Sequence, residues 1–314
     1  MKKFLIVMAA VFSLGLLISE LSAAEKYSLK TRFPEGKYTL LLEMDMKTAA
    51  ISQEEDVEPQ IMVQQKQIQT IKIVADPIKE DGTQKVAMKF ARVQVETDTI
   101  MGKMKYDSDD KESKNSPLNT VGIMVGLEFM TYFDKDGNIT KIEGVDEFFD
   151  KLIENAKVQE KPLLEMFKKE MSAERMAKNM NIVGEYLPKT PVEVGESWEN
   201  EQESELPLIG EMEMQINSTL KSVEKENGED VATILSKTEM SLKEPKDLDV
   251  QGMGVTFSKM DVKSDVTTKI EVKTGLMLSS ITKMEQIMQI GGAAEEEGML
   301  MQNILEMRNT VTRD

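Results

Sequence analysis

The chain has 314 residues, and its 39 Lys and Arg against 56 Asp and Glu give a formal net charge of −17 at pH 7. An acidic balance of this size repels nucleic acid and anionic lipid head groups. The sequence holds no His and no Cys, which excludes Ser–His and Cys–His nucleophile systems and the usual zinc sites. Aromatic residues make up only 5% of the chain, which argues against a platform for stacking sugars or bases.

The first residues have the pattern of an export signal. Lys2 and Lys3 precede an apolar run from Phe4 to Ile18, and small residues follow at Ser22, Ala23 and Ala24. We predict a cleaved signal peptide over residues 1–24 and a periplasmic or extracellular location, with an uncleaved anchor as the alternative. No cysteine follows the apolar run, and no later segment has the length of a membrane helix, so we expect no lipoprotein anchor and no integral membrane protein after cleavage.

A strand with one apolar side follows the turn at Phe33–Gly36. From Tyr38 to Met46 every second residue is apolar, and the residues between them include Thr39, Glu43 and Asp45. This period of two predicts a strand with one face on a core. Met44 and Met46 belong to the apolar side.

Three further β features follow in the N-terminal part. We expect strands over Pro59–Ala75 and Val86–Thr99, with a bulge near Ala91 and Arg92 because the apolar phase shifts there. Asp107–Asn119 reads as an exposed loop. The turn Asp134–Asn138 between two β-rich runs predicts a hairpin.

The middle of the chain has helical spacing. Val145–Ala156 carries Phe149 on its apolar stripe, and a second helix begins at Pro162 and carries Phe167. Ser172 is a candidate N-cap for a third helix. The prolines at 188 and 191 end this block.

The β pattern returns from Val192 and runs to the end of the chain. Trp198, the only tryptophan, begins a strand, and Met212 and Met214 alternate with glutamates in the next one. We expect the last segment, Met299–Val311, to be a strand, with a C-terminal helix as the alternative.

The two β-rich parts share an ordered set of weak matches. Gly36 corresponds to Gly195, the Met44 pair to the Met212 pair, and Gly137 to Gly275. We therefore predict an α+β fold with two similar antiparallel β-rich halves, curled sheets or half-barrels, joined and covered by a central helical segment. The expected boundaries are residues 25–144, 145–191 and 192–314.

Three segments carry a resemblance to known proteins. FPEGKY, YFDKDGNITKIEG and LPKTPVEVGESW resemble a family of exported bacterial proteins of unknown function. The expected architecture is also loosely similar to lipoprotein-carrier half-barrels, which hold acyl chains between a sheet and helices. Neither resemblance implies a catalytic site, because the shared motifs are turns and strands.

Methionine is frequent, at 25 residues, and offers three interpretations. The Met-x-Met pairs suit a packed core, a copper(I) site or a flexible apolar cavity. Copper is disfavoured without His or Cys, and the loop at Asp134 lacks the glycine and glutamate positions of a calcium-binding EF-hand, so we predict no metal and no cofactor. The predicted cavity lining is Met44, Met46, Met212, Met214, Trp198, Phe149 and Phe167.

The leading functional hypothesis is a non-catalytic exported protein that binds an apolar ligand or a lipidated partner between sheet and helices. Lipid or another envelope protein is the expected partner. The alternative is a structural module of the cell envelope with a closed core. No pair of carboxylates stands out as catalytic, so a hydrolase ranks third.

Overall fold

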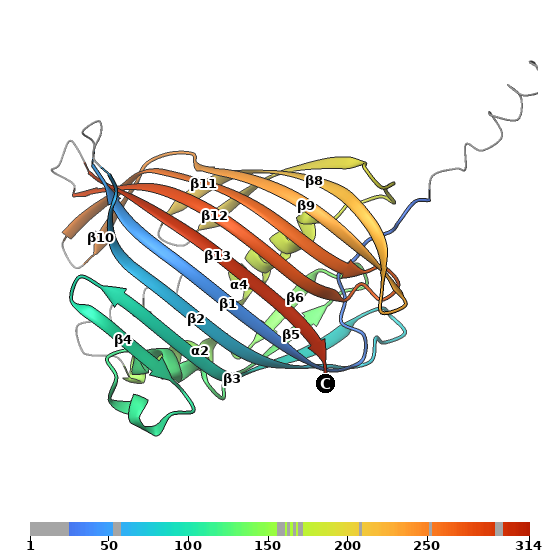
Figure 1. Cartoon of the computed structure of the whole chain (residues 1–314), viewed down its shortest axis with the longest axis horizontal. Coiled ribbons are helices and arrows are strands. Elements are labelled where there is room, and N and C mark those ends of the chain that lie inside the picture. The colour runs from blue at the N-terminus through green and yellow to red at the C-terminus, as the bar shows by residue number, and fades with distance from the viewer. Residues whose placement is uncertain are drawn as a thin grey trace, which may run out of the picture.

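The computed structural model describes residues 25–314 except 53–57, 156–160, 162–163, 166–167, 169–171, 207–208, 251–252 and 293–297. The described residues form one antiparallel sheet of 13 strands (Figure 1). Its strands are β1 Gly36–Ile51, β2 Gln60–Ala75, β3 Gln84–Thr99, β4 Gly102–Asp107, β5 Glu128–Phe133, β6 Ile139–Glu143, β7 Ser197–Leu206, β8 Gly210–Glu226, β9 Glu229–Leu242, β10 Lys246–Val250, β11 Met253–Glu271, β12 Met277–Gly292 and β13 Met299–Arg313.

The strand order shows that the predicted α+β fold is wrong, because the two β-rich parts form one large antiparallel sheet. The order is β6-β5-β3-β2-β1-β13-β12-β11-β9-β8-β7, with β4 paired to β3 and β10 paired to β11. The first strand pairs with the last, from Tyr38 opposite Arg313 to Ile51 opposite Leu300. This pairing satisfies the backbone hydrogen bonds along both strands and merges the two β-rich parts into one continuous sheet.

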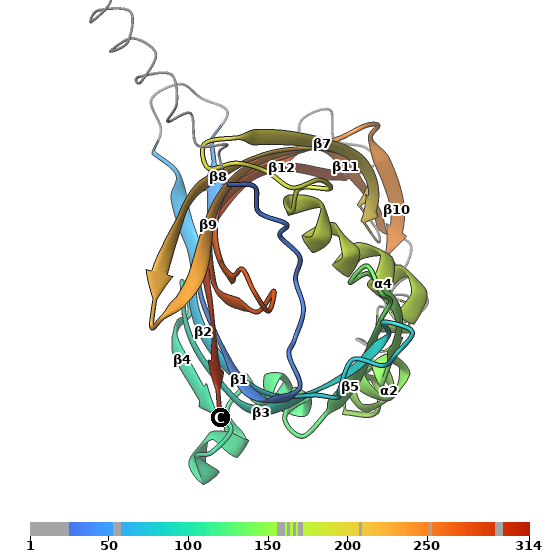
Figure 2. The same ribbon diagram turned by 90° about the vertical axis from the view of Figure 1, so that its right-hand side faces the viewer.

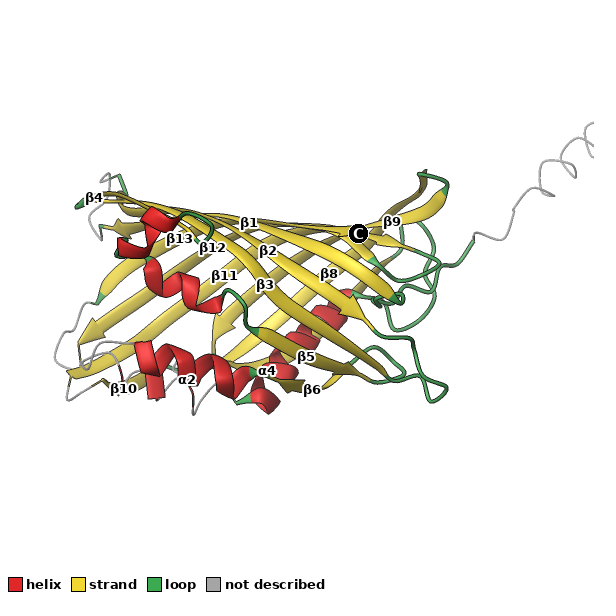
Figure 3. Cartoon of the chain, turned by 90° about the horizontal axis from the view of Figure 1, so that it is seen from below, coloured by secondary structure: helices red, strands yellow, loops and turns green. Residues whose placement is uncertain are grey.

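The sequence predicted a central helical segment that covers the β halves of an α+β fold, and the structure shows no such central layer among the described residues. The described helices are α2 Val145–Asn155 and α4 Ala173–Met180, with 3-10 turns η1 Lys111–Asn115, η2 Asn119–Met124 and η3 Asn181–Tyr186. α4 contacts β6, and η3 contacts β8. Figures 2 and 3 show that the sheet is curled, with α2 and α4 between its two edges. The helical segment therefore spans the gap between the edges.

Alternation along the strands decides which side chains face inward. Tyr38, Ile73 and Val86 are buried in one cluster, at 2%, 1% and 0% exposure, and lie on neighbouring strands. The predicted bulge in β3 is confirmed: Phe90 pairs with Ile71 and Arg92 with Thr70, which leaves Ala91 unpaired. The bulge restores the apolar phase, so that Val93 and Val95 again point inward.

Several local predictions are confirmed. The turn at Asp134–Asn138 joins β5 to β6, and the backbone N–H of Arg175 donates to the Ser172 hydroxyl at the start of α4. Met299–Arg313 is a strand. Most of the helix expected from Pro162, including Phe167, falls outside the described residues. Within the described part of the chain, no helix combines the length and the hydropathy needed to cross a membrane.

Candidate functional site

The inner face of the curled sheet brings together side chains from eight strands. Strand register places Met44 of β1 beside Met307 of β13 and Gln67 of β2, and Met46 beside Leu305 and Gln65. The first of these cross-strand rows continues through Thr282, Val266, Ser236, Ser218 and Trp198, and the second through Met284, Ser264, Thr238, Ile216 and Asn200.

These two inner rows contain no charged side chain. Every position of the adjacent row on the outer face is charged instead, through Lys66, Asp45, Glu306, Lys283, Asp265 and Lys237. Ion pairs form within this outer surface, such as Lys66 Nζ to Asp45 Oδ2 at 3.6 Å. Along these rows the sheet thus separates charged outer positions from uncharged inner positions that include Met44, Met46, Met284 and Met307.

The inner surface is open at its centre and closed toward β8. Met44, Met46 and Met307 are only half-buried although they point into the curl. By contrast, Met212 and Met214 on β8 are 0% and 4% exposed. Met212 belongs to a packed cluster with Met260 and Val262, and Met240, Leu242 and Met284 pack against that cluster.

The structure places the aromatic residues of the predicted lining in two separate clusters. Trp198 packs against the cluster that contains Leu187 and Val192, and its indole N–H donates to the Tyr186 carbonyl at 3.3 Å. Phe149 of α2 is 5% exposed and belongs to a cluster with Ile142 of β6. Four strands separate Met44 on β1 from Met214 on β8, which is about 24 Å across the sheet. The predicted residues that the structure describes therefore lie in separate places, and Phe167 falls outside the described residues.

The inner face carries two tyrosines with raised pKa values, and at its strap end Arg313, opposite Tyr38, pairs with the buried Glu271 at 3.0 Å. Burial raises the pKa of the Tyr38 phenol, with smaller opposing effects of Arg313 and Glu271, and burial also raises the pKa of Tyr106. Both phenols are therefore uncharged at physiological pH. The strongest shift lies elsewhere: the Arg92 guanidinium donates to Asp107 and lowers the pKa of that carboxyl to about 2.

Three polar atoms on inward-pointing positions lack a hydrogen-bond partner among the described residues. They are Thr97 Oγ1, Gln202 Nε2 and Asn309 Oδ1. Thr97 and Asn309 share a face with buried Val95 and Val311, respectively. Because buried polar groups are nearly always paired, these atoms call for water or for polar groups of a ligand inside the curl.

An extended segment that we term the N-terminal strap, residues 25–35, crosses one end of the curl (Figure 2). At its start Tyr27 exchanges two backbone hydrogen bonds with Val192, at 2.8 and 3.0 Å. Farther along, the backbone N–H of Arg32 donates to the Gly275 carbonyl at 2.8 Å, and Gln84 donates to the Phe33 carbonyl at 2.5 Å. The strap thus connects walls that are distant along the sheet.

Two turn glycines allow the strap to approach closely. Gly275, with φ +77°, would place a Cβ 2.5 Å from the Lys30 carbonyl oxygen, and Gly137, with φ +89°, would place one 3.2 Å from the Thr31 carbonyl oxygen. The positive φ favours glycine at both positions, and at Gly275 the 2.5 Å distance also leaves no room for a Cβ. These glycines correspond to each other in the sequence comparison of the two β parts, and in the structure they contact neighbouring strap residues.

A cavity of about 250 Å³ lies beneath the strap. Its walls are mostly apolar and include Phe33 of the strap, Leu40, Ile73, Met88, Phe133, Ile139 and Met277, with Arg32, Gln84, Asp134, Asn138 and Asn181 as polar groups. The sequence prediction contains none of these residues. The cavity assembles from a strap without periodicity, the β5–β6 hairpin, the strands β1, β2, β3 and β12, and the turn η3, so no local pattern marks it.

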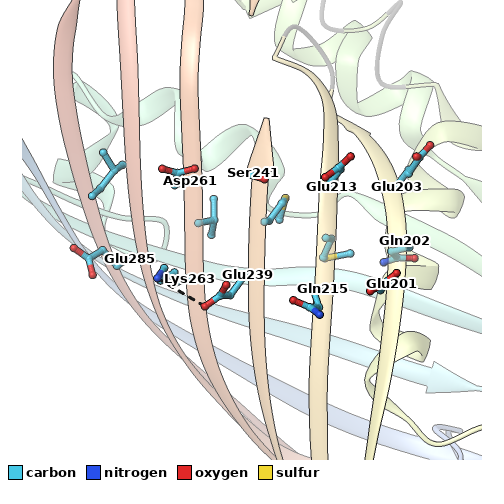
Figure 4. Close-up of a pocket in the computed structure, with 14 residues that line it drawn as sticks. Glu201, Gln202, Glu203, Glu213, Gln215, Glu239, Ser241, Asp261, Lys263 and Glu285 are labelled. Carbon is cyan, nitrogen blue, oxygen red and sulfur yellow. Dashed lines mark ion pairs between the residues drawn. The ribbon is translucent and has the colours of Figure 1, made fainter. Parts of the chain in front are cut away.

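A larger groove of about 980 Å³ lies on the outer face across β7, β8, β9, β11 and β12 (Figure 4). Six of its side chains are carboxylates and one is an ammonium, Lys263, which lies 3.7 Å from Glu239. Among the described residues, no group of three or more Asp or Glu side chains is arranged to hold a metal ion. We interpret this groove as a solvated acidic surface.

Comparison with known proteins assigns the chain to a family. A model described as a family of unknown function, DUF6263, matches residues 81–277. The chain belongs to this family. The DUF6263 region includes two of the three segments, YFDKDGNITKIEG and LPKTPVEVGESW, on which the resemblance to a family of unknown function was based. No curated protein matches the sequence.

A search of solved structures matches this DUF6263 protein to several chains at low TM-scores, three of which follow. A structure titled "Lipid-protein interactions in lipovitellin" matches at 11% identity and a TM-score of 0.43, over 90% of this chain and 25% of that one. The beta domain of the Bordetella autotransporter BrkA matches at 8% identity and 0.27, over 88% and 100%. An outer membrane channel from Pseudomonas putida F1 matches at 6% and 0.23, over 90% and 97%. The chain spans a quarter of the lipovitellin chain, and no functional inference follows from TM-scores this low.

Proposed function

We propose that this protein is a non-catalytic exported binding protein that holds an apolar ligand against the inner face of its curled sheet. The observation that supports the proposal is the half-buried, uncharged surface around Met44, Met46 and Met307. A closed core would bury these side chains as completely as Met212. Unbranched thioether chains adapt to ligands of irregular shape, and methionine is therefore common at such binding surfaces.

The energetics favour an alkyl ligand on this surface. Each methylene that leaves water for an apolar environment contributes about 0.8 kcal/mol. The two inner rows offer no charge that a ligand would have to desolvate, whereas the outer row through Asp45 carries a charge at every position from β2 to β9. An apolar chain therefore gains more inside the curl than on its outer surface.

A second candidate function is a structural module of the cell envelope with a closed core. The complete burial of Met212 and Ile216 on β8 favours it for that part of the sheet. The two functions differ at β1 and β13, where a binding protein needs accessible side chains. Export itself depends on residues 1–24, and N-terminal sequencing of the protein from its own host would test cleavage after Ala24.

Native mass spectrometry of the protein purified from its own host tests the proposed function. We expect a bound mass that organic solvent extracts and that added alkyl ligand replaces. A protein that carries no adduct and binds no long-chain alkyl compound after extraction would support the closed module and contradict the binding function.

A further inference from the structure

We infer that the cavity beneath the N-terminal strap is a head-group site, in which Arg32 binds the carboxylate of a single long-chain fatty acid. This inference rests on the proposed function and specifies its ligand class. The alkyl chain would leave the cavity along the inner face of β1.

Arg32 is a cation without a carboxylate partner. Its guanidinium donates to the backbone carbonyl of Lys135, and among the described residues no carboxylate oxygen lies within 4.0 Å of it. The protein is strongly acidic, and two other arginines in it have carboxylate partners: Arg313 lies 3.0 Å from Glu271, and Arg92 lies 2.6 Å from Asp107. An arginine has five N–H donors in a planar fork that suits a carboxylate.

The one carboxylate among the cavity residues is already occupied. Asp134 accepts hydrogen bonds from the backbone N–H groups of Asp136 and Asn138, at 2.8 and 2.9 Å, and from the Asn138 side chain at 3.1 Å. Burial raises the pKa of Asp134, but donation by Asn138 and Asp136 outweighs it, and the net shift is downward. Its charge is therefore held within the turn, and Arg32 remains available to an anion.

The cavity is too small to hold the whole alkyl chain of a long-chain fatty acid, so the chain must extend beyond it. A volume of about 250 Å³ holds about eight groups of the size of a water molecule or a methylene. Leu40 lines the cavity and shares the inner side of β1 with Leu42, Met44 and Met46. From Leu40 to Met46 the strand rises about 20 Å, which gives the alkyl chain a continuous apolar path.

Charge distribution fixes the direction of the ligand. The inner rows at Met44 and Met46 are uncharged across the described strands, so they offer no partner for an ionised head. The strap end of the same face offers Arg32. A fatty acid therefore matches the uncharged inner rows with its alkyl chain and Arg32 with its carboxylate only when the carboxylate lies beneath the strap.

Equilibrium dialysis with labelled hexadecanoate and hexadecan-1-ol at pH 8 tests the inference on the full-length purified protein. The variants are Arg32→Gln, which removes the charge, Arg32→Lys, which keeps it, and Arg308→Gln as a control. Arg308 is exposed on the outer face of β13, opposite Glu43, and its substitution changes the net charge equally.

We expect the wild-type protein and R308Q to bind hexadecanoate at least about tenfold more tightly than the alcohol, as a charge-assisted hydrogen bond implies. R32Q should lose this preference and retain its affinity for the alcohol, and R32K should keep most of the preference. Equal affinity of the wild type for acid and alcohol would overturn the inference and leave the proposed function standing. Loss of alcohol binding in R32Q would assign Arg32 to strap stability instead, and wild-type protein that binds neither compound would contradict both proposals.

Discussion

The close contact between Gly275 and the strap makes a quantitative prediction. In Gly275→Ala the new Cβ would lie 2.5 Å from the Lys30 carbonyl oxygen and 3.2 Å from the Arg32 nitrogen. The strap or the turn must move by about 1 Å to reach ordinary contact, and this movement weakens the hydrogen bond from Arg32 to Gly275. Gly228→Ala is the matched control, because Gly228 also lies in a hairpin turn, has φ +90° and would place a new Cβ with no atom within 4 Å.

The losses in the free energy of unfolding of the two variants should differ only by the effect of the strap contact. A left-handed backbone costs an alanine about 1–2 kcal/mol, which applies to both variants. The lost hydrogen bond and the displaced strap add about 1 kcal/mol at position 275. We therefore expect urea unfolding to show a loss of about 1–2 kcal/mol for G228A and of about 2–3 kcal/mol for G275A, with similar m-values.

Limited trypsin digestion tests independently whether G275A displaces the strap. Lys30 and Arg32 are cleavage sites within the strap, and a displaced strap exposes them. We expect G275A to be cleaved there faster than the wild type, and G228A at the wild-type rate. Equal stability losses and equal cleavage rates in the two variants would refute the account of the strap as a clamped segment.

Three further substitutions test other parts of the structure. Asp107→Asn should lower stability by about 1 kcal/mol above pH 4, a value reduced from the pKa shift because Arg92 is 41% exposed. Because the folded-state pKa of about 2 lies below the ordinary value, this difference should disappear as the pH falls toward 2 in unfolding titrations, and a constant difference would contradict the ion pair. Met44→Gln should weaken alkyl binding about three- to tenfold in dialysis, whereas Ile304→Gln on the outer face of the neighbouring strand should not; equal effects would count against the inner site. Trp198→Phe should lower the free energy of unfolding by about 1 kcal/mol through the lost N–H donation, without changing alkyl affinity, and a large loss of affinity would place the ligand near β7 instead.

The sequence predicts local structure well because local structure follows local periodicity. The alternation from Tyr38 to Met46 identifies the inner side of β1, and the phase shift near Ala91 identifies the bulge. The hydroxyl at Ser172 identifies a helix start because it can accept a backbone N–H. Each of these signals lies within a few residues of the feature that it specifies.

The single sheet could not be predicted in the same way. It depends on the pairing of β1 with β13, whose partners Tyr38 and Arg313 lie at opposite ends of the chain. The recurrent glycines that suggested two similar halves have another role in the structure, because Gly137 and Gly275 both make room for the strap.

The candidate site was predicted in part. Alternation places Met44 and Met46 on the inner face, but it does not reveal that they remain half-buried, since that depends on the curvature of the whole sheet. Arg32 and Phe33 carry no periodic signal, because an extended strap has no repeating contact with a neighbour. The cavity beneath the strap is therefore visible only in three dimensions.

Methionine oxidation provides the most direct test of the claim that the inner face is an accessible ligand surface. Peroxide converts accessible methionines to sulfoxides, and mass spectrometry measures each position. We predict that Met44, Met46 and Met307 are oxidised in ligand-free protein and protected by a bound long-chain alkyl ligand, whereas Met101, at 89% exposure on the β3–β4 turn, is oxidised in both states. Inner-face methionines that resist oxidation without ligand, or that are oxidised equally with and without it, would contradict the account.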